Sequence, residues 1–460
     1  MPKSFRFALF FLVLLTSFTH SSLSAQSTDE GSPQMPPSAI LFQNVRIFDG
    51  KNAALSAPSN VLVRGNKIER ISTAPIPIDR SAATQVIEGN GLTLMPGLID
   101  AHWHAFLVAP STTTILTADV GYLYLLAGQE AGRTLMRGFT SVRDMAGPTF
   151  GIKRAIDSGV ITGPRIWPSG AMISQSGGHG DFRLPYEVPR ALDAPLNHGE
   201  QLGAGVIADG ADQVLLRVRE QMMLGASQVK LAAGGGVASL YDPLDVTQYT
   251  EAEFHAAVEA AQNWGTYVTV HAYTPDAIQT AIRAGVKCIE HGQLMDEATA
   301  KMMAEKGIWL SIQPFIDDED ANKYPEGSPN RAKQLEVSKG TDTAYGFAKK
   351  YKLKTAWGTD ILGDQKRAAR QGAMLAKMVR WYSPGEVLTM ATSTNAELLA
   401  MSGRRNPYPG KLGVVEEGAL ADLLLVKGDP IGDIKLVEDP DKNFLVIMKN
   451  GKIYKSTLSK

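Results

Sequence analysis

The chain has 460 residues, of which 44% are hydrophobic and 20% are charged, as in an ordinary globular protein with a large core. Its formal net charge of −1 excludes a strongly basic surface, so the sequence predicts no nucleic-acid partner and no polybasic membrane patch. The single cysteine, Cys288, excludes an intramolecular disulfide, and its apolar neighbours indicate a small core residue.

The N-terminus carries the pattern of a secretory signal peptide. Lys3 and Arg6 precede a largely apolar run over 7–18, and small residues follow it. The run is shorter than the roughly 20 residues that a membrane-spanning helix requires. We therefore expect a signal peptide over 1–25, a linker over 26–38, and export to the periplasm or the medium with no stable membrane anchor.

Short strands and turns fill both ends of the remaining chain. Over 39–95, runs of β-branched residues stop at Asp49-Gly50 and at Gly65-Asn66, which are hairpin signals. The same pattern returns over 407–460, where Asn450-Gly451 separates two apolar runs. We expect one small β-sandwich domain built from both of these segments.

The middle of the chain, over 96–406, alternates strand-like apolar runs with helical stretches such as Glu251–Trp264 and Pro275–Ala284. This alternation predicts a parallel α/β architecture. A closed TIM (β/α)8 barrel and an open doubly wound sheet both fit it, and the positions of the polar residues decide between them.

Residues that can bind metal follow several of these strand-like runs. His102 and His104 end the first run, and alternate residues of an extended strand share a face, so both imidazoles can reach one ion. His271, His291 and Asp360 each end a later run. Any one of them alone has ordinary structural uses, such as a helix cap. Their repetition at strand ends, where barrels carry function, predicts a metal site.

Lys230 ends another strand-like run and precedes a glycine-rich segment. An unmodified lysine, with a pKa of about 10.4, is a cation that repels metal. Carboxylated by CO₂, it becomes an anionic carbamate whose two oxygens can bridge two divalent ions. The alternative is a buried lysine paired with a carboxylate, which a barrel interior tolerates only at a cost. The sequence leaves both readings open.

These residues resemble the amidohydrolase superfamily over nearly all of the chain after the predicted signal peptide. The matching segments are Pro96–His104, the strand-end Lys230, His271 and His291, and Gly358-Thr-Asp360, in that order. The resemblance implies a TIM barrel and two divalent metal ions. It implies that His102, His104 and Asp360 hold one ion, that His271 and His291 hold the other, and that an N6-carboxylysine at Lys230 bridges them. Imidazole and carboxylate ligands favour zinc, with manganese and cobalt as alternatives.

The mechanism implied by the resemblance is attack of a metal-bridging hydroxide on the carbonyl carbon. Asp360 would take the proton and deliver it to the leaving nitrogen. The segments Ser174–Asp181, Lys230–Val237 and His271–Pro275 are similar to the prolidase-like branch. That branch contains Xaa-Pro dipeptidases, zinc carboxypeptidases and ochratoxin-hydrolysing amidases, with imidazolonepropionase more distant. A small-molecule substrate with an amide bond to a C-terminal amino acid is therefore expected: a dipeptide, an N-acyl amino acid or an ochratoxin-like amide.

Three further residues are candidates for contacting this substrate. His179, flanked by glycines, is expected to touch the substrate or its carboxylate, or else to be an exposed turn residue. Tyr241 is expected to donate its hydroxyl to a carboxylate or an oxyanion, or else to pack in a lid. Arg143 ends a strand and is expected to face the same rim, or else to pair with the adjacent Asp144.

Three other functions compete with amide hydrolysis. Mononuclear deaminases of the superfamily carry H-x-x-E, whereas His271 is followed by Ala-Tyr-Thr. A cyclic-amide hydrolase of the imidazolonepropionase type would share the same metal site. A catalytically degenerate exported binding protein is the alternative outside enzymology, and the complete set of ligand residues argues against it. A homo-oligomer is an open expectation, because related enzymes often assemble.

Overall fold

A computed structural model describes residues 39–78, 84–191, 194–322 and 324–458. The predicted signal peptide (1–25) and linker (26–38) lie outside the described residues, so both stay predictions. Within the described ranges, no helix combines the length and the apolar character needed to cross a bilayer.

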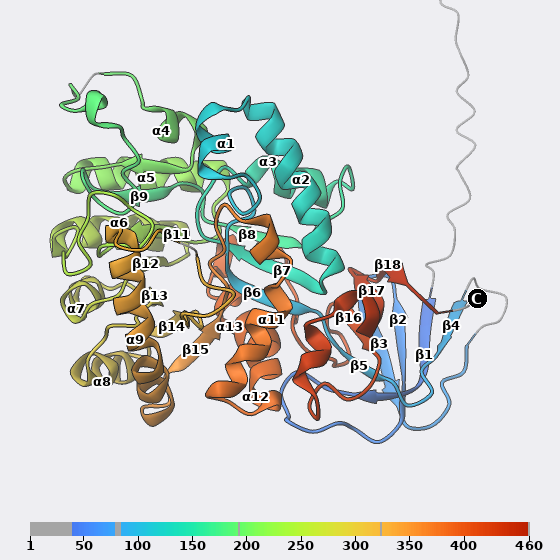
Figure 1. Cartoon of the computed structure of the whole chain (residues 1–460). Coiled ribbons are helices and arrows are strands. Elements are labelled where there is room, and N and C mark those ends of the chain that lie inside the picture. The colour runs from blue at the N-terminus through green and yellow to red at the C-terminus, as the bar shows by residue number, and fades with distance from the viewer. Residues whose placement is uncertain (1–38, 79–83, 192–193, 323, 459–460) are drawn as a thin grey trace, which may run out of the picture. The chain divides into compact units, whose positions relative to one another are not determined.

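Strands from both ends of the chain join in one mixed sheet, in which the N-terminal strands (blue) lie beside the C-terminal ones (red) (Figure 1). The order is β18-β17-β16-β5-β1-β2-β3, and β4 pairs with β1. The strands are β1 (Ala39–Ile47), β2 (Ser59–Arg64), β3 (Lys67–Ser72), β4 (Thr84–Glu88), β5 (Thr93–Pro96), β16 (Leu423–Val426), β17 (Phe444–Lys449) and β18 (Lys452–Ser456).

The strand β1 runs through both halves of this sheet. Its register shifts between Phe42 and Val45, and the intervening Asn44 has a φ of 53°. Its first part pairs with β2 and β4, whereas its end pairs with β5. Apolar side chains of both halves share one buried core, which includes Ile40 and Leu425. The prediction of a β domain built from both termini is therefore confirmed, with β1 as the strand that makes its two halves continuous.

The middle of the chain forms parallel strands with helices packed outside them (Figure 1). The strands are β6 (Leu98–Trp103), β7 (Phe139–Asp144), β8 (Arg165–Pro168), β11 (Val229–Ala232), β12 (Val268–Ala272), β13 (Cys288–His291), β14 (Trp309–Ile312) and β15 (Lys354–Trp357), with the short β9 (Met172–Ser174) and β10 (Gly205–Ile207) beside them. Nearly all of their residues are buried, as parallel strands covered on both faces require.

These strands close into a ring. One ladder joins β6 to β8, and a second joins β11 to β15. The ladders meet where the Ser227 N–H donates to the Pro168 carbonyl (2.7 Å) and where the Asp360 N–H donates to the His102 carbonyl (2.8 Å). The closed ring is the predicted TIM (β/α)8 barrel, and the doubly wound alternative is wrong.

The helices follow local sequence signals. Thr250 and Glu253 form a capping box at the start of α6, and Gly265 ends it in the left-handed conformation, so the predicted bounds Glu251–Trp264 are confirmed. The other helices are α1 (Thr112–Thr117), α2 (Val120–Met136), α3 (Phe150–Asp157), α4 (His198–Leu202), α5 (Ala211–Leu224), α7 (Pro275–Arg283), α8 (Glu297–Lys306), α9 (Pro329–Lys350), α10 (Gln365–Ala368), α11 (Gln371–Ala376), α12 (Pro384–Thr389), α13 (Asn395–Ala400) and α14 (Pro440–Asn443).

Asn395 clamps the first barrel strand to the last. A π-helical turn, Met390–Thr394, connects α12 to α13 and delivers Asn395 to a fully buried position. Its Nδ2 donates to the carbonyls of Ile99 and Trp357, both at 2.8 Å, and its Oδ1 accepts the Trp357 N–H at 3.0 Å. The clamp thus spans β6 and β15 at the point where the barrel closes.

We predict that Asn395→Ala destabilises the protein by about 3 kcal/mol, because buried backbone groups left without a partner cost about 1–3 kcal/mol each. Urea denaturation measures this free energy of unfolding. Asn263→Ala, at an exposed position of α6, is the control and should change stability by no more than about 0.5 kcal/mol. If Asn395→Ala and Asn263→Ala have the same free energy of unfolding, Asn395 does not stabilise the closure between β6 and β15.

Candidate metal centre

Five of the six predicted ligands lie at the C-terminal end of a barrel strand or just beyond it: His102 in β6, His104 directly after it, His271 in β12, His291 at the end of β13, and Asp360 after β15. Lys230 is the second residue of the four-residue β11 and lies earlier in its strand. Parallel strands of a barrel open their C-terminal ends on one side. Residues far apart in the sequence are therefore brought together there.

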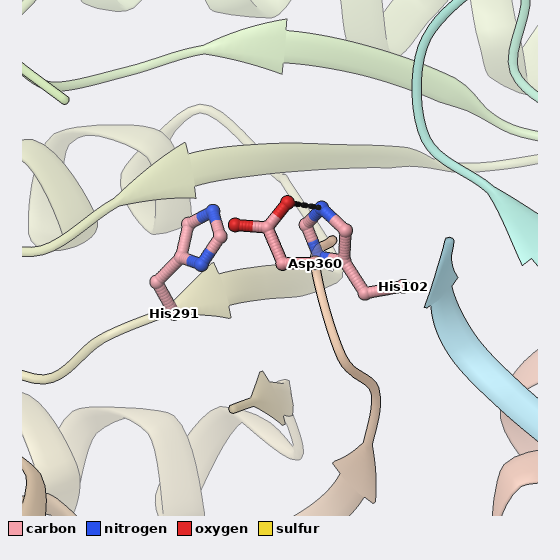
Figure 2. Close-up of side chains that lie close together, drawn as sticks. All are labelled: His102, His291 and Asp360. Carbon is pink, nitrogen blue, oxygen red and sulfur yellow. Dashed lines mark ion pairs between the residues drawn. The ribbon is translucent and has the colours of Figure 1, made fainter. Parts of the chain in front are cut away.

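The closest group consists of His102, His291 and Asp360, whose ligand atoms all lie within 4.8 Å of one another (Figure 2). Nε2 of His102 is 3.3 Å from Oδ1 of Asp360, and Nε2 of His104 is 3.0 Å from the same oxygen. The ring centre of His271 is 4.4 Å from that of His291. His102, His291 and Asp360 form a metal-binding group, and His104 and His271 adjoin it.

Burial keeps the imidazoles of His102, His271 and His291 neutral. It lowers the pKa of His102 to about 4, and it lowers the pKa values of His271 and His291 well below the ordinary value of about 6.5. A neutral imidazole offers a nitrogen lone pair, which is the form that binds metal. These three histidines can therefore coordinate an ion at neutral pH.

Hydrogen bonds to residues around the metal centre determine which ring nitrogen of His291 and of His271 carries the lone pair. Nδ1–H of His291 donates to Oε1 of Gln313 at 2.7 Å, and Nε2–H of His271 donates to the Gly235 carbonyl at 3.1 Å, because both acceptors can only accept. The opposite nitrogen of each ring carries the lone pair. Partners of this kind set the tautomer and the orientation of metal ligands.

Glu290 performs the same role for His102. One of its carboxylate oxygens accepts Nδ1–H of His102 at 2.8 Å, and the other accepts Nη2–H of Arg143 at 2.6 Å. Burial raises the pKa of Glu290, but Arg143 and His102 outweigh that effect and hold the pKa well below its usual range. Glu290 is therefore a carboxylate that fixes the His102 ring with Nε2 toward Asp360.

The predicted place of Arg143 at the rim is wrong, and so is its predicted pairing with Asp144. Arg143 is fully buried, and its guanidinium donates to the Ala101 carbonyl, to Glu290 and to side chains deeper in the barrel. An inward-facing cation in an apolar interior needs a counter-charge, and Glu290 supplies it. Among the described residues Glu290 links Arg143 to His102, and the full burial of Arg143 does not fit a substrate contact at the rim.

Two of the ligands have strained backbones. His291 has a φ of 79° and Asp360 a φ of 54°, in the left-handed region that side chains disfavour. A Cβ on Gly358 would lie 2.4 Å from the backbone nitrogen of His102, so only glycine lets the end of β15 approach β6 this closely. Such strain persists where the surrounding packing over-determines it, typically at functional sites.

Lys230 lies in this centre without a partner. It is 2% exposed, and in the described part of the chain its ammonium makes no hydrogen bond and no ion pair. Burial lowers its pKa, although Glu290 and Asp360 oppose the effect. The neutral amine that a lowered pKa favours is the nucleophile needed to form a carbamate with CO₂. The environment therefore fits the bridging role and does not fit a lysine paired with a carboxylate.

His179 is brought to the metal centre. Its ring stacks on His271 with the ring centres 3.9 Å apart, and its Nδ1 lies 2.8 Å from Oγ of Ser239. Burial lowers its pKa to about 4, against the effect of Asp242. A Cβ on Gly236 would lie 1.9 Å from the His179 ring, which explains the glycine at that position. His179 is thus held beside the ligands rather than in an exposed turn.

The hydroxyl of Tyr241 is not brought to the metal ligands. It donates to the Arg183 carbonyl at 2.5 Å, and the residue is 41% exposed. Its phenol proton is engaged in this hydrogen bond and is not directed at a substrate carboxylate or oxyanion. The contact agrees with the alternative prediction, in which Tyr241 packs in a lid.

Three residues of the centre are not predicted from the sequence: Glu290, Gln313 and Tyr273. Tyr273 lies two residues after His271, and its ring centre is 4.9 Å from that of His271 and 5.2 Å from that of His291. The available signal was Glu290 itself, a charged residue inside an apolar strand and directly before a ligand. Gln313 follows β14 at the strand-end position that the ligands occupy elsewhere.

The model of the amidohydrolase family matches residues 93–454, which include the whole barrel and the metal centre. The chain belongs to the amidohydrolase family. Ochratoxinase of Aspergillus niger is 32% identical to it over 378 residues, which cover 79% of this chain and 75% of ochratoxinase.

Solved structures of the same family superpose closely. A prolidase complexed with N-methylphosphonate-L-proline is 33% identical, with a TM-score of 0.82 over 91% of this chain and 100% of the prolidase. A Xaa-Pro dipeptidase with methionine bound in its active site is 30% identical, with a TM-score of 0.77 and the same coverage of both chains. This amidohydrolase therefore belongs to the prolidase- and ochratoxinase-like branch. It is a metal-dependent hydrolase acting on carbon–nitrogen bonds, as predicted.

We predict that Glu290→Gln weakens metal binding by roughly 10–100-fold, because the anionic partner that orients His102 is lost. The same change leaves the buried Arg143 without a counter-charge, so stability should fall by about 3–5 kcal/mol. Metal titration and urea denaturation measure the two effects.

The control is Glu305→Gln on the exposed face of α8, which should alter neither quantity. A Glu290→Gln variant with wild-type metal affinity would contradict the assigned role of Glu290.

Proposed function

We propose that this amidohydrolase cleaves the amide bond to a C-terminal amino acid, in a dipeptide, an N-acyl amino acid or an ochratoxin-like amide, with two divalent cations. The observation that carries the proposal is the convergence of His102, His291 and Asp360 with two adjoining histidines and an unpartnered lysine. Relatives named ochratoxinase, prolidase and Xaa-Pro dipeptidase support this substrate class.

We assign one cation to His102, His104 and Asp360 and the other to His271 and His291. An N6-carboxylysine at Lys230 would bridge them, which its buried and unpaired position supports. Zinc is the favoured metal, because imidazole and carboxylate ligands suit it. Bound cations of this kind lower the pKa of water towards about 7 and polarise the substrate carbonyl.

Asp360 moves the proton in the proposed reaction. Burial raises its pKa, but the neighbouring His102 and the hydrogen bond with His104 outweigh that effect, so the group is ionised at neutral pH. An ionised carboxylate can accept the proton of the attacking water and deliver it to the leaving nitrogen. His179, held by Ser239 beside His271, is positioned to contact the substrate.

We also propose that the protein is exported to the periplasm or secreted. The support is the signal-peptide pattern over 1–25.

A substrate panel tests the proposal. The zinc-loaded protein is incubated with N-acyl amino acids, dipeptides, ochratoxin-like amides and cyclic imides, and released amino acids are quantified by mass spectrometry. We expect turnover of linear amides that end in a free amino acid. Turnover of cyclic imides alone would overturn the proposal in favour of the cyclic-amide alternative.

We predict that Lys230→Ala lowers the metal content below two ions per chain and reduces turnover by roughly 100-fold or more, because the bridging ligand is lost. Plasma emission spectroscopy measures the metal. Lys449→Ala is the matched control, since Lys449 is a buried lysine of β17 that donates to the Gly163 carbonyl. A Lys230→Ala variant that keeps two metal ions per chain and full turnover would contradict the bridging role of Lys230.

A further inference from the structure

Arg367 is a cation beside the metal centre that the proposed reaction has not used. It lies in α10, on the segment that leaves β15 through Asp360. This segment is fixed to the residues after His104, because the N–H groups of Gly363 and Asp364 donate to the carbonyls of Leu107 and Val108 at 3.0 and 2.9 Å. The same short stretch of chain thus carries both a metal ligand and Arg367.

The guanidinium of Arg367 is held in a defined position. Its Nε–H donates to the Asp320 carbonyl at 2.7 Å, and its Nη1 donates to the side-chain oxygen of Asn322. Both acceptors lie on the loop after β14, and the residue is 8% exposed. Two neutral oxygens therefore orient the guanidinium while three of its five N–H groups remain available.

Arg367 forms no ion pair with any carboxylate in the described part of the chain. The Asp320 side chain is occupied by Arg370 and Lys377. The Asp364 side chain caps α10 by accepting backbone N–H groups. Arginine stays charged in proteins, and a largely buried charge without a counter-ion is costly. Asp364, Asp360 and Asp320 act on the charge of Arg367 without forming an ion pair with it, so its remaining N–H groups can bind an anionic ligand.

The groups around Arg367 place it on the active-site side. Burial lowers its pKa, and Asp364, Asp360 and Tyr324 oppose that effect. Burial raises the pKa of Tyr324, and Asp360 raises it further. The backbone hydrogen bonds of Asp360, Gly363 and Asp364 to His102, Leu107 and Val108 keep the start of α10 at the end of the barrel that carries the metal ligands. His179, which burial keeps neutral, cannot supply a positive charge to an anionic ligand.

We propose that Arg367 binds the free carboxylate of the substrate's C-terminal residue. This inference rests on the proposed function and deepens it. A guanidinium pairs with a carboxylate through charge-assisted hydrogen bonds, which are stronger than neutral ones. The nitrogen of the scissile amide is two bonds from the carboxylate carbon, so this pairing would restrict where the amide can lie. It would also make a free C-terminal carboxylate the feature that the enzyme selects.

The experiment compares kcat/KM for matched pairs of substrates, each an N-acyl amino acid and its C-terminal amide, in the zinc-loaded wild type, Arg367→Met and Arg367→Lys. We expect the wild type to prefer the acid. Arg367→Met should lower kcat/KM for the acid by roughly 10–150-fold, the value of one charged hydrogen bond, and leave the amide unchanged. Arg367→Lys, which keeps the charge without the planar fork, should lie between the two.

Arg370→Met is the matched control, because Arg370 lies on the same segment, is half exposed and pairs with acidic side chains. It should keep the wild-type preference, and metal content should be equal in all variants. An unchanged acid-to-amide preference in both Arg367 variants would overturn the inference while leaving amide hydrolysis intact. If the wild type cleaves no linear amide at all, the proposed function fails, and this inference fails with it.

Discussion

The hydrogen bond from the Asp360 N–H to the His102 carbonyl, 2.8 Å long, closes the barrel and assembles the metal site at once. It ties the exit of the last strand to the first strand, so that the carboxylate and the H-x-H pair meet. The approach requires glycine at position 358 and a left-handed backbone at Asp360. Packing of the barrel offsets that strain. Because the same contacts close the barrel, they also fix the positions of His102 and Asp360.

The interior of the barrel carries an unusual amount of polarity for a core. Glu290 and Arg143 form a fully buried ion pair beneath His102, and Lys230 is buried without any partner in the described chain. Replacing such groups by apolar ones is often neutral or stabilising, so stability does not explain them. Their contacts with the metal-binding group explain the ion pair, because Glu290 orients His102 and balances the charge of Arg143.

The sequence sufficed for the fold and for the metal-binding group of His102, His291 and Asp360 because of one geometric rule. Residues at the C-terminal ends of parallel strands open on one side, so a local pattern around His102 or His291 specifies neighbours that are distant in the chain. The rule does not say how deep in the barrel an inward side chain lies. Arg143 was therefore expected at the rim, whereas it is buried against Glu290, which is 147 residues away in the sequence. Loop residues such as Arg367 are harder still, because the path of a loop depends on packing that no local pattern encodes.

Crystals of the zinc-loaded protein, with anomalous diffraction measured at the zinc absorption edge, test whether the site is binuclear. We expect two anomalous peaks. One lies among His102, His104 and Asp360, the other between His271 and His291, with continuous density from Nζ of Lys230 bridging them. A single peak coordinated by His102, His291 and Asp360, beside an unmodified Lys230, would contradict the binuclear site.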